Sequence, residues 1–178
     1  MTDARAEILR CAQDFEYCAK YFKIVTKRSR LEPFQLNDAQ KDIIGSLSRN
    51  DNLMMLKARQ LGSTTGIAAY FFWKALFTPT AVVAHTDEAV KKIFEIYRLF
   101  YDELPDFLKL ETVRARENQL KFVTGSSIRI GSASSQSFRG GTYQLIHASE
   151  YAFWGNMEET IASLFSTATE TAKIVLES

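Results

Sequence analysis

The residues of this chain that could do chemistry gather first at positions 57–65, where the sequence reads Lys-Ala-Arg-Gln-Leu-Gly-Ser-Thr-Thr. An apolar run from Leu53 to Leu56 precedes this stretch, and a mostly apolar run from Gly66 to Phe72 follows it. A buried strand, a tight turn and a helix that opens on hydroxyl residues are typical of a phosphate-binding loop, because N–H groups and the helix dipole favour an anion there. The residues expected to bind phosphate are Lys57, Ala58, Arg59, Gln60, Leu61, Gly62, Ser63, Thr64 and Thr65.

The match to the pattern G-x-x-x-x-G-K-[ST] is partial, and an ordinary polar turn between a strand and a helix would fit this stretch as well. Lys57 takes the place of the first glycine and Ser63 that of the lysine, while Thr64 keeps the hydroxyl place that faces a metal ion. The β- and γ-phosphates still need a side-chain cation. We favour Lys57, at the front of the loop, over Arg59, whose planar fork could clamp two phosphate oxygens.

A second stretch, Tyr143 to Glu150, is a mostly apolar strand that ends on a carboxylate. In phosphate-loop ATPases an acidic residue near the loop holds Mg²⁺ and another group orients the attacking water. Glu150 is placed for the second role. Ser149 stands where most such enzymes carry an aspartate, and it could orient a metal-bound water. We therefore expect the metal to be held by Thr64 and, through water, by Ser149 and Glu150.

These motifs together resemble the ATPase domain of the large terminase subunit, the motor that packages DNA into the procapsids of tailed phages. The resemblance rests on residues 57–65, on Val-Ala-His-Thr at 83–86, on Ser-Phe-Arg-Gly-Gly-Thr at 137–142 and on His-Ala-Ser-Glu-Tyr-Ala-Phe-Trp at 147–154. It implies an ATPase that uses ATP and Mg²⁺ in the cytoplasm of an infected bacterial host. It also implies double-stranded DNA, the procapsid portal, the small terminase subunit and further copies in a ring as partners.

The resemblance adds two residues to the site. Gln40 matches the glutamine that reads the adenine edge, a role that suits an amide able to donate and to accept. From the sequence alone Gln40 would be a surface residue in the first turn of a helix that is capped by Asn37. Arg139 matches the arginine proposed to reach the ATP of a neighbouring subunit, although a loop arginine bound to nearby carbonyls is an equal alternative.

Composition narrows the class of protein without identifying a partner. The 178 residues suffice for one α/β domain with a full core, and no apolar run approaches the roughly 20 residues of a membrane span. The start of the chain lacks the apolar segment of a secretory signal. Because the net charge is only +1, no global field draws this protein to nucleic acid, so a DNA contact would need a local patch or other copies. Cys11 and Cys18 are expected to be core thiols within one helix, without a disulfide.

The pattern predicts an α/β fold of the P-loop NTPase type, with a mainly parallel sheet, flanking helices and an added antiparallel hairpin. Helices are expected at about 4–24, 37–48, 64–77, 87–104 and 157–167; strands at 53–56, 80–86, 143–150 and 172–177; and the hairpin at 119–123 and 127–130. We expect a single ATPase domain over 1–178, with its core from about 34, and no nuclease activity, because the usual nuclease domain is absent from this chain. Two alternatives remain: a catalytically silent nucleotide-fold scaffold that docks DNA, and a helicase-like ATPase, against which the absence of an Asp-Glu-x-[DH] box argues.

Overall fold

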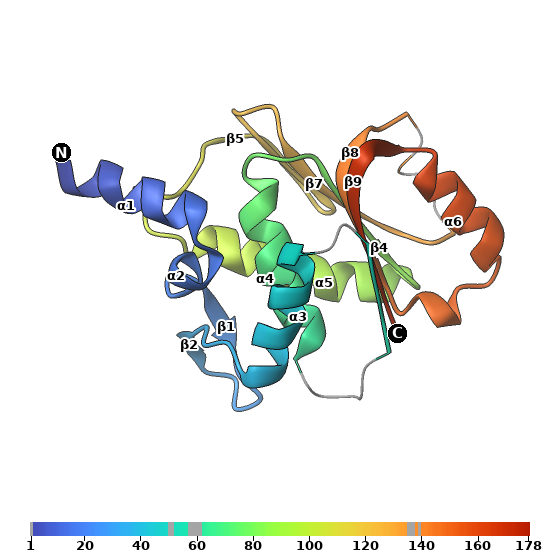
Figure 1. The fold of residues 1–178 in the computed structure, drawn as a ribbon, viewed down its shortest axis with the longest axis horizontal. Helices are drawn as coiled ribbons and strands as arrows, with labels where there is room; N and C mark the ends of the chain where they lie inside the picture. The colour runs from blue at the N-terminus through green and yellow to red at the C-terminus, as the bar shows by residue number, and fades with distance from the viewer. Residues whose placement is uncertain (1, 50–51, 57–61, 135–137, 139) are drawn as a thin grey trace.

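A computed structural model describes residues 2–49, 52–56, 62–134, 138 and 140–178. Within this part of the chain, seven strands form one sheet in the order β3-β9-β8-β4-β7-β6-β5 (Figure 1). The strands are β3 (Asn52–Met55), β4 (Thr80–Ala84), β5 (Thr112–Arg116), β6 (Gln119–Phe122), β7 (Ser127–Ser132), β8 (Tyr143–Ser149) and β9 (Ala168–Glu177). The first five in the sheet order are parallel, and the β7-β6-β5 end is antiparallel. A mainly parallel sheet with an antiparallel extension confirms the predicted fold class.

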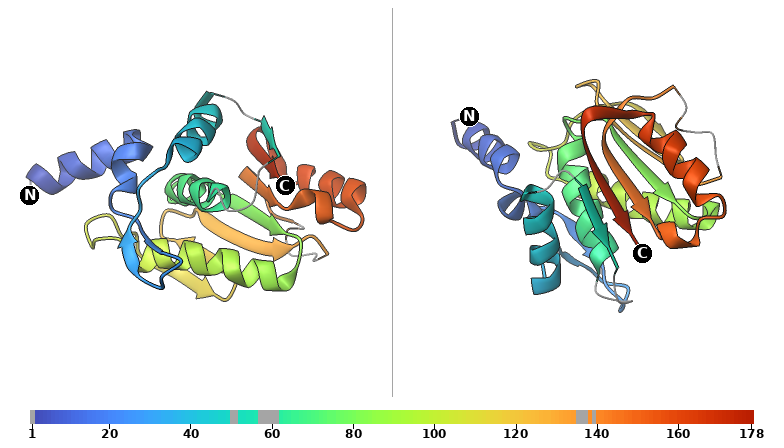
Figure 2. Two further views of the ribbon diagram at one scale, coloured as in Figure 1. Left: turned by 90° about the horizontal axis from the view of Figure 1, so that it is seen from below. Right: turned by 45° about the vertical axis from the view of Figure 1, so that its right-hand side comes forward.

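Helices cover both faces of the sheet. The helices are α1 (Thr2–Gln13), α2 (Phe15–Ala19), α3 (Asp38–Arg49), α4 (Ser63–Ala75), α5 (Asp87–Asp102) and α6 (Met157–Phe165), with a short 3-10 turn η1 (Tyr151–Phe153). Figure 2 shows α3, α4 and α5 on one side of the sheet and α6 on the other. None of the described helices is long and apolar enough to cross a membrane.

Strand β4 shows how one strand serves two cores. Because successive side chains of a strand point to opposite faces, Val82 and Ala84 pack into the larger core with α4 and α5, while Ala81 and Val83 pack into a smaller core with Leu164 of α6. All five residues of β4 are buried, as expected of a central parallel strand. The ends of β4 are thereby fixed from both faces.

Helix α4 is the most enclosed helix of the fold. Ten of its residues are buried, including Ile67, Phe71 and Phe72, so the sequence-based expectation of a helix that is apolar on nearly all sides is confirmed. The predicted helices α3 and α5, strands β4 and β8, and the β6–β7 hairpin are also confirmed. The expected strand from 172 is longer and begins at Ala168.

The strand before the phosphate loop was wrongly expected to be buried. β3 pairs with β9 and borders the sheet, and Met54 is 66% exposed. Its alternating pattern of exposed and half-buried residues is that of a strand with one face toward the protein. The apolar run misled the prediction because periodicity cannot separate a short edge strand from a central one.

The single N-terminal helix expected over 4–24 is also wrong. The helix breaks at Asp14, whose side chain accepts a hydrogen bond from the Tyr17 backbone N–H at 3.0 Å and caps α2. A short antiparallel hairpin that the sequence did not predict follows, formed by β1 (Lys23–Val25) and β2 (Leu31–Pro33), with the basic residues 27–30 at its turn. The expectation of buried free thiols at Cys11 and Cys18 is confirmed.

One buried hydrogen bond ties the N-terminal segment to α4. The indole Nε1–H of Trp73, near the end of α4, donates to the Cys11 carbonyl of α1 at 2.6 Å. The carbonyl lies just before the break at Asp14, where the helical ladder is interrupted, and the Phe15 ring packs 5.6 Å from the Trp73 ring. Trp73 therefore satisfies a buried polar group and supplies packing at the same contact.

We expect Trp73→Phe to keep most of the packing but to leave the Cys11 carbonyl without its donor, which costs about 1–3 kcal/mol of unfolding free energy. Urea unfolding measures the loss, and hydrogen exchange should rise in α1 and α2 first. Trp154→Phe is the matched control, because Trp154 lies on the other face of the sheet and should leave exchange in α1 unchanged. Equal exchange of α1 in wild type and Trp73→Phe would contradict the proposed tie.

Candidate functional site

The polar residues of interest meet at the carboxyl edge of the parallel strands. β4, β8 and β9 run in the same direction, so their carboxyl ends lie at one edge, and α4 and α5 begin there. A cavity of about 360 Å³ at this edge is lined by Thr64 of α4, by His85 after β4, and by Ser149 and Glu150 at the end of β8. Ligands of open α/β sheets bind at this edge. The sequence placed Thr64, Ser149 and Glu150 in one site, and the fold brings them together.

The start of α4 is arranged to receive an anion. Gly62 stands at the N-cap position of α4 in a left-handed conformation with φ of 69°. Because glycine has no side chain, the N-cap residue makes no side-chain hydrogen bond to the first N–H groups of the helix. The Ser63 hydroxyl is buried and has no hydrogen-bond partner within the described part of the chain. The first N–H groups of a helix lack partners in its own backbone. The end of α4 that faces the loop can therefore bind a phosphate group.

Gln40 is buried, so its interpretation as a surface residue was wrong. Its backbone N–H donates to Asn37 Oδ1 at 2.9 Å, and its side-chain Oε1 accepts from the Asn37 N–H at 3.0 Å, which is a reciprocal cap of α3. Its Nε2 also donates to the Gly62 carbonyl at 2.9 Å. Gln40 thus holds the glycine that opens α4, and its contact with adenine stays a prediction.

Glu150 is held in an unusual backbone conformation. Its φ of 55° and ψ of 39° lie in the left-handed region, which a residue with a Cβ rarely adopts. Such conformations cluster at functional sites. Its carboxylate is 47% exposed, and Oε2 lies 3.1 Å from His85 Nδ1, at ion-pair distance. The turn therefore projects Glu150 beyond the end of β8, where its carboxylate lies beside His85 in the lining of the cavity.

The turn after Glu150 is fastened from behind by Trp154. The Phe153 N–H donates to the Glu150 carbonyl at 3.0 Å, and the buried Trp154 indole donates to the Ser149 carbonyl at 3.2 Å. Trp154 packs in the smaller core with Leu164. The Phe153 N–H and the Trp154 indole thus hold the backbone of Glu150 and Ser149 where the chain leaves the strand.

Glu177 lies behind the cavity residues Thr64 and Ser149, and the sequence analysis did not single it out. Its carboxylate is fully buried at the end of β9, and its Oε1 accepts hydrogen bonds from Ser149 Oγ at 2.8 Å and from Thr64 Oγ1 at 3.0 Å. His147 Nε2 lies 3.3 Å from the same oxygen. Burial, and then the charge of Glu177, raise the pKa of the buried Tyr97 above its usual value. A carboxylate at the end of an apolar strand was the signal that identified Glu150, and it applied equally to Glu177.

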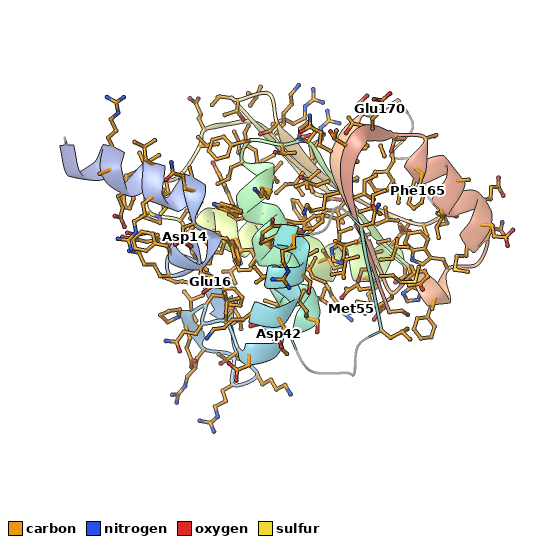
Figure 3. All side chains as sticks on the ribbon, viewed as in Figure 1. Asp14, Glu16, Asp42, Met55, Phe165 and Glu170 are labelled. Carbon is orange, nitrogen blue, oxygen red and sulfur yellow. The ribbon has the colours of Figure 1, made fainter. Side chains whose placement is uncertain are left out.

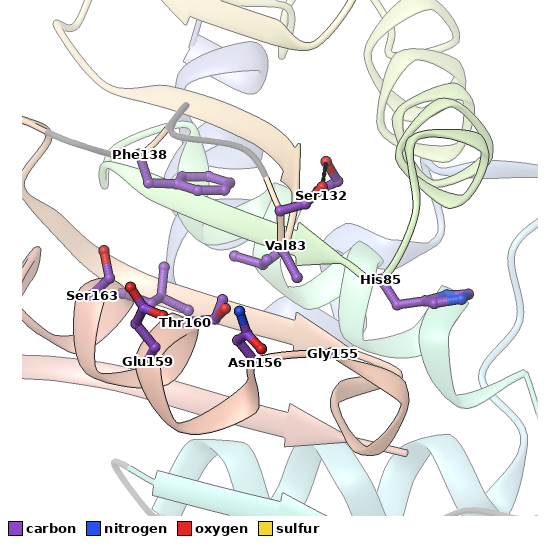
Figure 4. A pocket seen from close by; sticks show the side chains of 12 residues that line it. Val83, His85, Ser132, Phe138, Gly155, Asn156, Glu159, Thr160 and Ser163 are labelled. Carbon is purple, nitrogen blue, oxygen red and sulfur yellow. Dashed lines mark hydrogen bonds between the residues drawn. The ribbon is translucent and has the colours of Figure 1, made fainter.

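A second cavity lies on the α6 side of the sheet (Figure 4). Its volume is about 440 Å³, and its lining includes Val83, Phe138, Asn156 and Glu159. His85 lies at one end of this cavity and also lines the first one, so the two cavities share a lining residue just after β4. The side chains of Asn156 and Glu159 come from the start of α6.

Several predicted site residues lie outside the described part of the chain. These are Lys57, Ala58, Arg59, Gln60, Leu61 and Arg139. The choice between Lys57 and Arg59 as the phosphate cation, and the reach of Arg139 to another subunit, stay predictions. Thr65 lies in the first turn of α4, next to Thr64.

Comparison with known proteins identifies the family. The sequence model described as "Terminase large subunit, T4likevirus-type, N-terminal" matches residues 54–176. The chain belongs to this terminase family. The match begins within β3 and stops one residue before the end of β9, so it contains Thr64, Ser149 and Glu150 but not Glu177.

Solved structures of phage terminases share the fold of this terminase chain. The HK97 bacteriophage large terminase superposes with a TM-score of 0.75 at 16% identity, over 94% of this chain and 37% of that one. The large terminase ATPase domain of Thermus phage P74-26 gives 0.63 at 17% identity, over 82% and 65%. A large terminase from a thermophilic bacteriophage, in complex with ADP, gives 0.60 at 16% identity, over 80% and 38%. The chain thus spans little more than a third of the HK97 protein.

Gly62 has a steric role that a substitution can test. The backbone at position 62 has a φ of 69°, and an added Cβ would lie 3.0 Å from Gln40 Nε2. We expect Gly62→Ala to lower the unfolding free energy by about 1–3 kcal/mol and to weaken binding of a nucleotide at the start of α4.

Gly125→Ala is the matched control for this prediction. Gly125, in the β6–β7 turn, also has a positive φ, of 87°, but nothing lies within 4 Å of the place that an added Cβ would take. It should lose stability from backbone strain alone and leave ligand binding unchanged. Adding Gln40→Ala to Gly62→Ala should restore part of the lost stability, because it removes the close contact. If Gly62→Ala and Gly125→Ala behave alike in both measurements, the contact with Gln40 does not contribute to the effect.

Proposed function

We propose that this terminase chain hydrolyses ATP with Mg²⁺ and is the motor part of a DNA-packaging large subunit. One observation carries the proposal: the Thr64 hydroxyl and the Glu150 carboxylate line the same cavity, at the start of a helix that Gly62 opens without a side-chain cap. Phosphoryl transfer needs this combination of an anion cradle, a metal-facing hydroxyl and a group that orients water. The ADP complex of the thermophilic phage terminase, which shares the fold, supports a nucleotide as ligand.

The residues present fit a magnesium nucleotide. Thr64 and Ser149 offer hydroxyl oxygens and Glu177 offers a carboxylate within one hydrogen-bonded group, and oxygen ligands of this kind suit Mg²⁺. When bound, the metal neutralises charge on the phosphate oxygens. The buried hydroxyl of Ser63 has no hydrogen-bond partner among the described residues, so it can donate to a phosphate oxygen.

Glu150 is the group that orients the attacking water. Its carboxylate is half-exposed and can meet a water, while Nδ1 of His85 lies 3.1 Å from one of its oxygens, at ion-pair distance. His85 is a positioning residue in this proposal, because it acts through Glu150. Arg139 would reach the nucleotide of a neighbouring copy in a ring, and Gln40 would contact adenine with the donor and acceptor capacity that its internal bonds leave.

The packaging role extends the proposal beyond the site. Double-stranded DNA, the procapsid portal, the small terminase subunit and other copies of this chain are the proposed partners, in the cytoplasm of the infected host. With a net charge of +1, contact with DNA depends on local patches or on the assembled ring. Binding of a fluorescent ATP analogue followed by phosphate release tests the enzymatic core of the proposal and separates it from a silent scaffold.

Glu150→Gln keeps the size and the polar character of the side chain but removes the charge that polarises water. We expect nucleotide binding near that of wild type and phosphate release below one tenth of wild type. Fluorescent nucleotide titration and steady-state phosphate release measure the two quantities.

Glu170→Gln is the control, because Glu170 is an exposed carboxylate near the start of β9, whereas Met55 pairs with Glu177 at the other end of that strand (Figure 3). It should leave both quantities unchanged. Turnover by Glu150→Gln above one tenth of wild type would remove Glu150 from catalysis.

The cation of the loop is tested by two alanine variants. Lys57→Ala is expected to fold, as judged by its melting temperature, and to lose ATP hydrolysis, because loop N–H groups and Ser63 cannot balance the phosphate charge alone. Arg59→Ala should retain measurable turnover. The reverse result, with Lys57→Ala active and Arg59→Ala inactive, would assign the phosphate cation to Arg59.

A further inference from the structure

An acidic residue that the phosphate-loop motifs do not include, Glu177, lies next to Thr64 and Ser149. Ser149 occupies the place of the usual aspartate at the end of β8, and its hydroxyl is neutral, so it cannot supply the negative charge of a carboxylate to a metal ion. The parallel register pairs Ser149 with Glu177 on the adjoining strand β9. The carboxylate therefore lies one strand away from its usual position, at the same level of the sheet.

Glu177 also lies next to the end of β3, the strand that precedes the phosphate-loop sequence. The Ser178 N–H donates to the Met55 carbonyl at 3.0 Å, which continues the pairing of β9 with β3 to the point where the loop begins. β9 is thus the strand between the loop strand and the strand of Glu150. A side chain at the end of β9 can therefore contact residues that follow β3 and residues at the end of β8.

The hydrogen bond from Thr64 has the direction that a metal site needs. A hydroxyl has one proton and two lone pairs, and Thr64 commits its proton to Glu177 Oε1 at 3.0 Å. A lone pair of the same hydroxyl oxygen can then face a cation at the start of α4. Ser149 donates to the same carboxylate oxygen at 2.8 Å and so fixes the carboxylate from the other side.

We propose that Glu177 is the carboxylate of the Mg²⁺ site and that Ser149 positions it. The inference rests on the proposed nucleotide function and adds a residue to it. The serine and the glutamate are complementary in this arrangement, because an aspartate at 149 would bring a second carboxylate to the oxygen that Ser149 now contacts, and like charges that close cannot both stay ionised without cost. The site accommodates the acid on β8 or on β9.

Glu177→Gln tests the proposal because the amide keeps an oxygen that can accept from Thr64 and Ser149 but has no charge. The test has two measurements. Electron paramagnetic resonance gives the affinity for Mn²⁺ with ADP present, and titration gives the affinity for fluorescent ADP, once in EDTA and once in Mg²⁺. We expect ADP affinity in EDTA within about twofold of wild type and metal affinity lower by about 10–100-fold. Glu170→Gln, the same change on the same strand, should match wild type in both.

The exchanged pair Ser149→Asp/Glu177→Ser separates a metal role from a purely structural one. It moves the acid back to β8, and we expect it to recover Mn²⁺ binding to within about tenfold of wild type. Ser149→Asp alone should melt at least about 3 °C below the exchanged pair, because it places two carboxylates together.

Each result decides the proposal. Metal affinity of Glu177→Gln within twofold of wild type overturns it, and so does an exchanged pair that folds but binds no metal. If Glu177→Gln does not fold, the exchanged pair alone gives the answer. A wild-type chain that binds no ADP with or without metal would instead overturn the proposed nucleotide function, which is a separate failure seen before any variant is made.

Discussion

The enclosure of α4 is the constraint on which the site depends. Its buried residues pack against the sheet, α3 and α5, so the helix cannot slide along its axis without opening the core. At its start, Gln40 occupies the space above Gly62 and Gly66, where a Cβ on either glycine would lie 3.0 Å from the Gln40 side chain. The packing of α4 therefore sets the position of Thr64.

The carboxyl edge of the sheet gathers groups that are far apart in the sequence. Thr64 and Glu177 are joined by a hydrogen bond across 113 positions, and Ser149 meets Glu177 across 28. Parallel register makes this possible, since each strand delivers its last residue to the same level. The result is a group of hydroxyl and carboxylate oxygens whose geometry is held by backbone pairing on either side.

The sequence predicted those parts of the fold in which local pattern and tertiary position agree. Helix α5 was anticipated through its inner face of Val90, Ile93, Phe94, Tyr97 and Phe100, all buried, and Thr86 caps it. The break at Asp14 was missed because the apolar repeat of Cys11, Phe15 and Cys18 continues across it, whereas the competing cap is formed by one side chain. Glu177 was missed because strand order cannot be derived from a pattern along one chain, and its significance depends on β9 lying between β3 and β8. Motif spacing singled out Glu150, which lines the cavity, but it could not show that His85 lies 3.1 Å from it.

The position of β3 at the border of the sheet affects how the protein behaves in concentrated solution. Among the described strands β3 pairs with β9 alone, and its neighbour Leu56 is 83% exposed. A short, apolar border strand offers its remaining N–H and C=O groups to any extended segment that approaches, and edge-to-edge pairing of this kind is a common route to aggregation. Because the strand leads directly into the segment 57–65, a chain that added there would also lie close to the proposed nucleotide site. Loss of soluble protein and loss of ligand binding would then occur together.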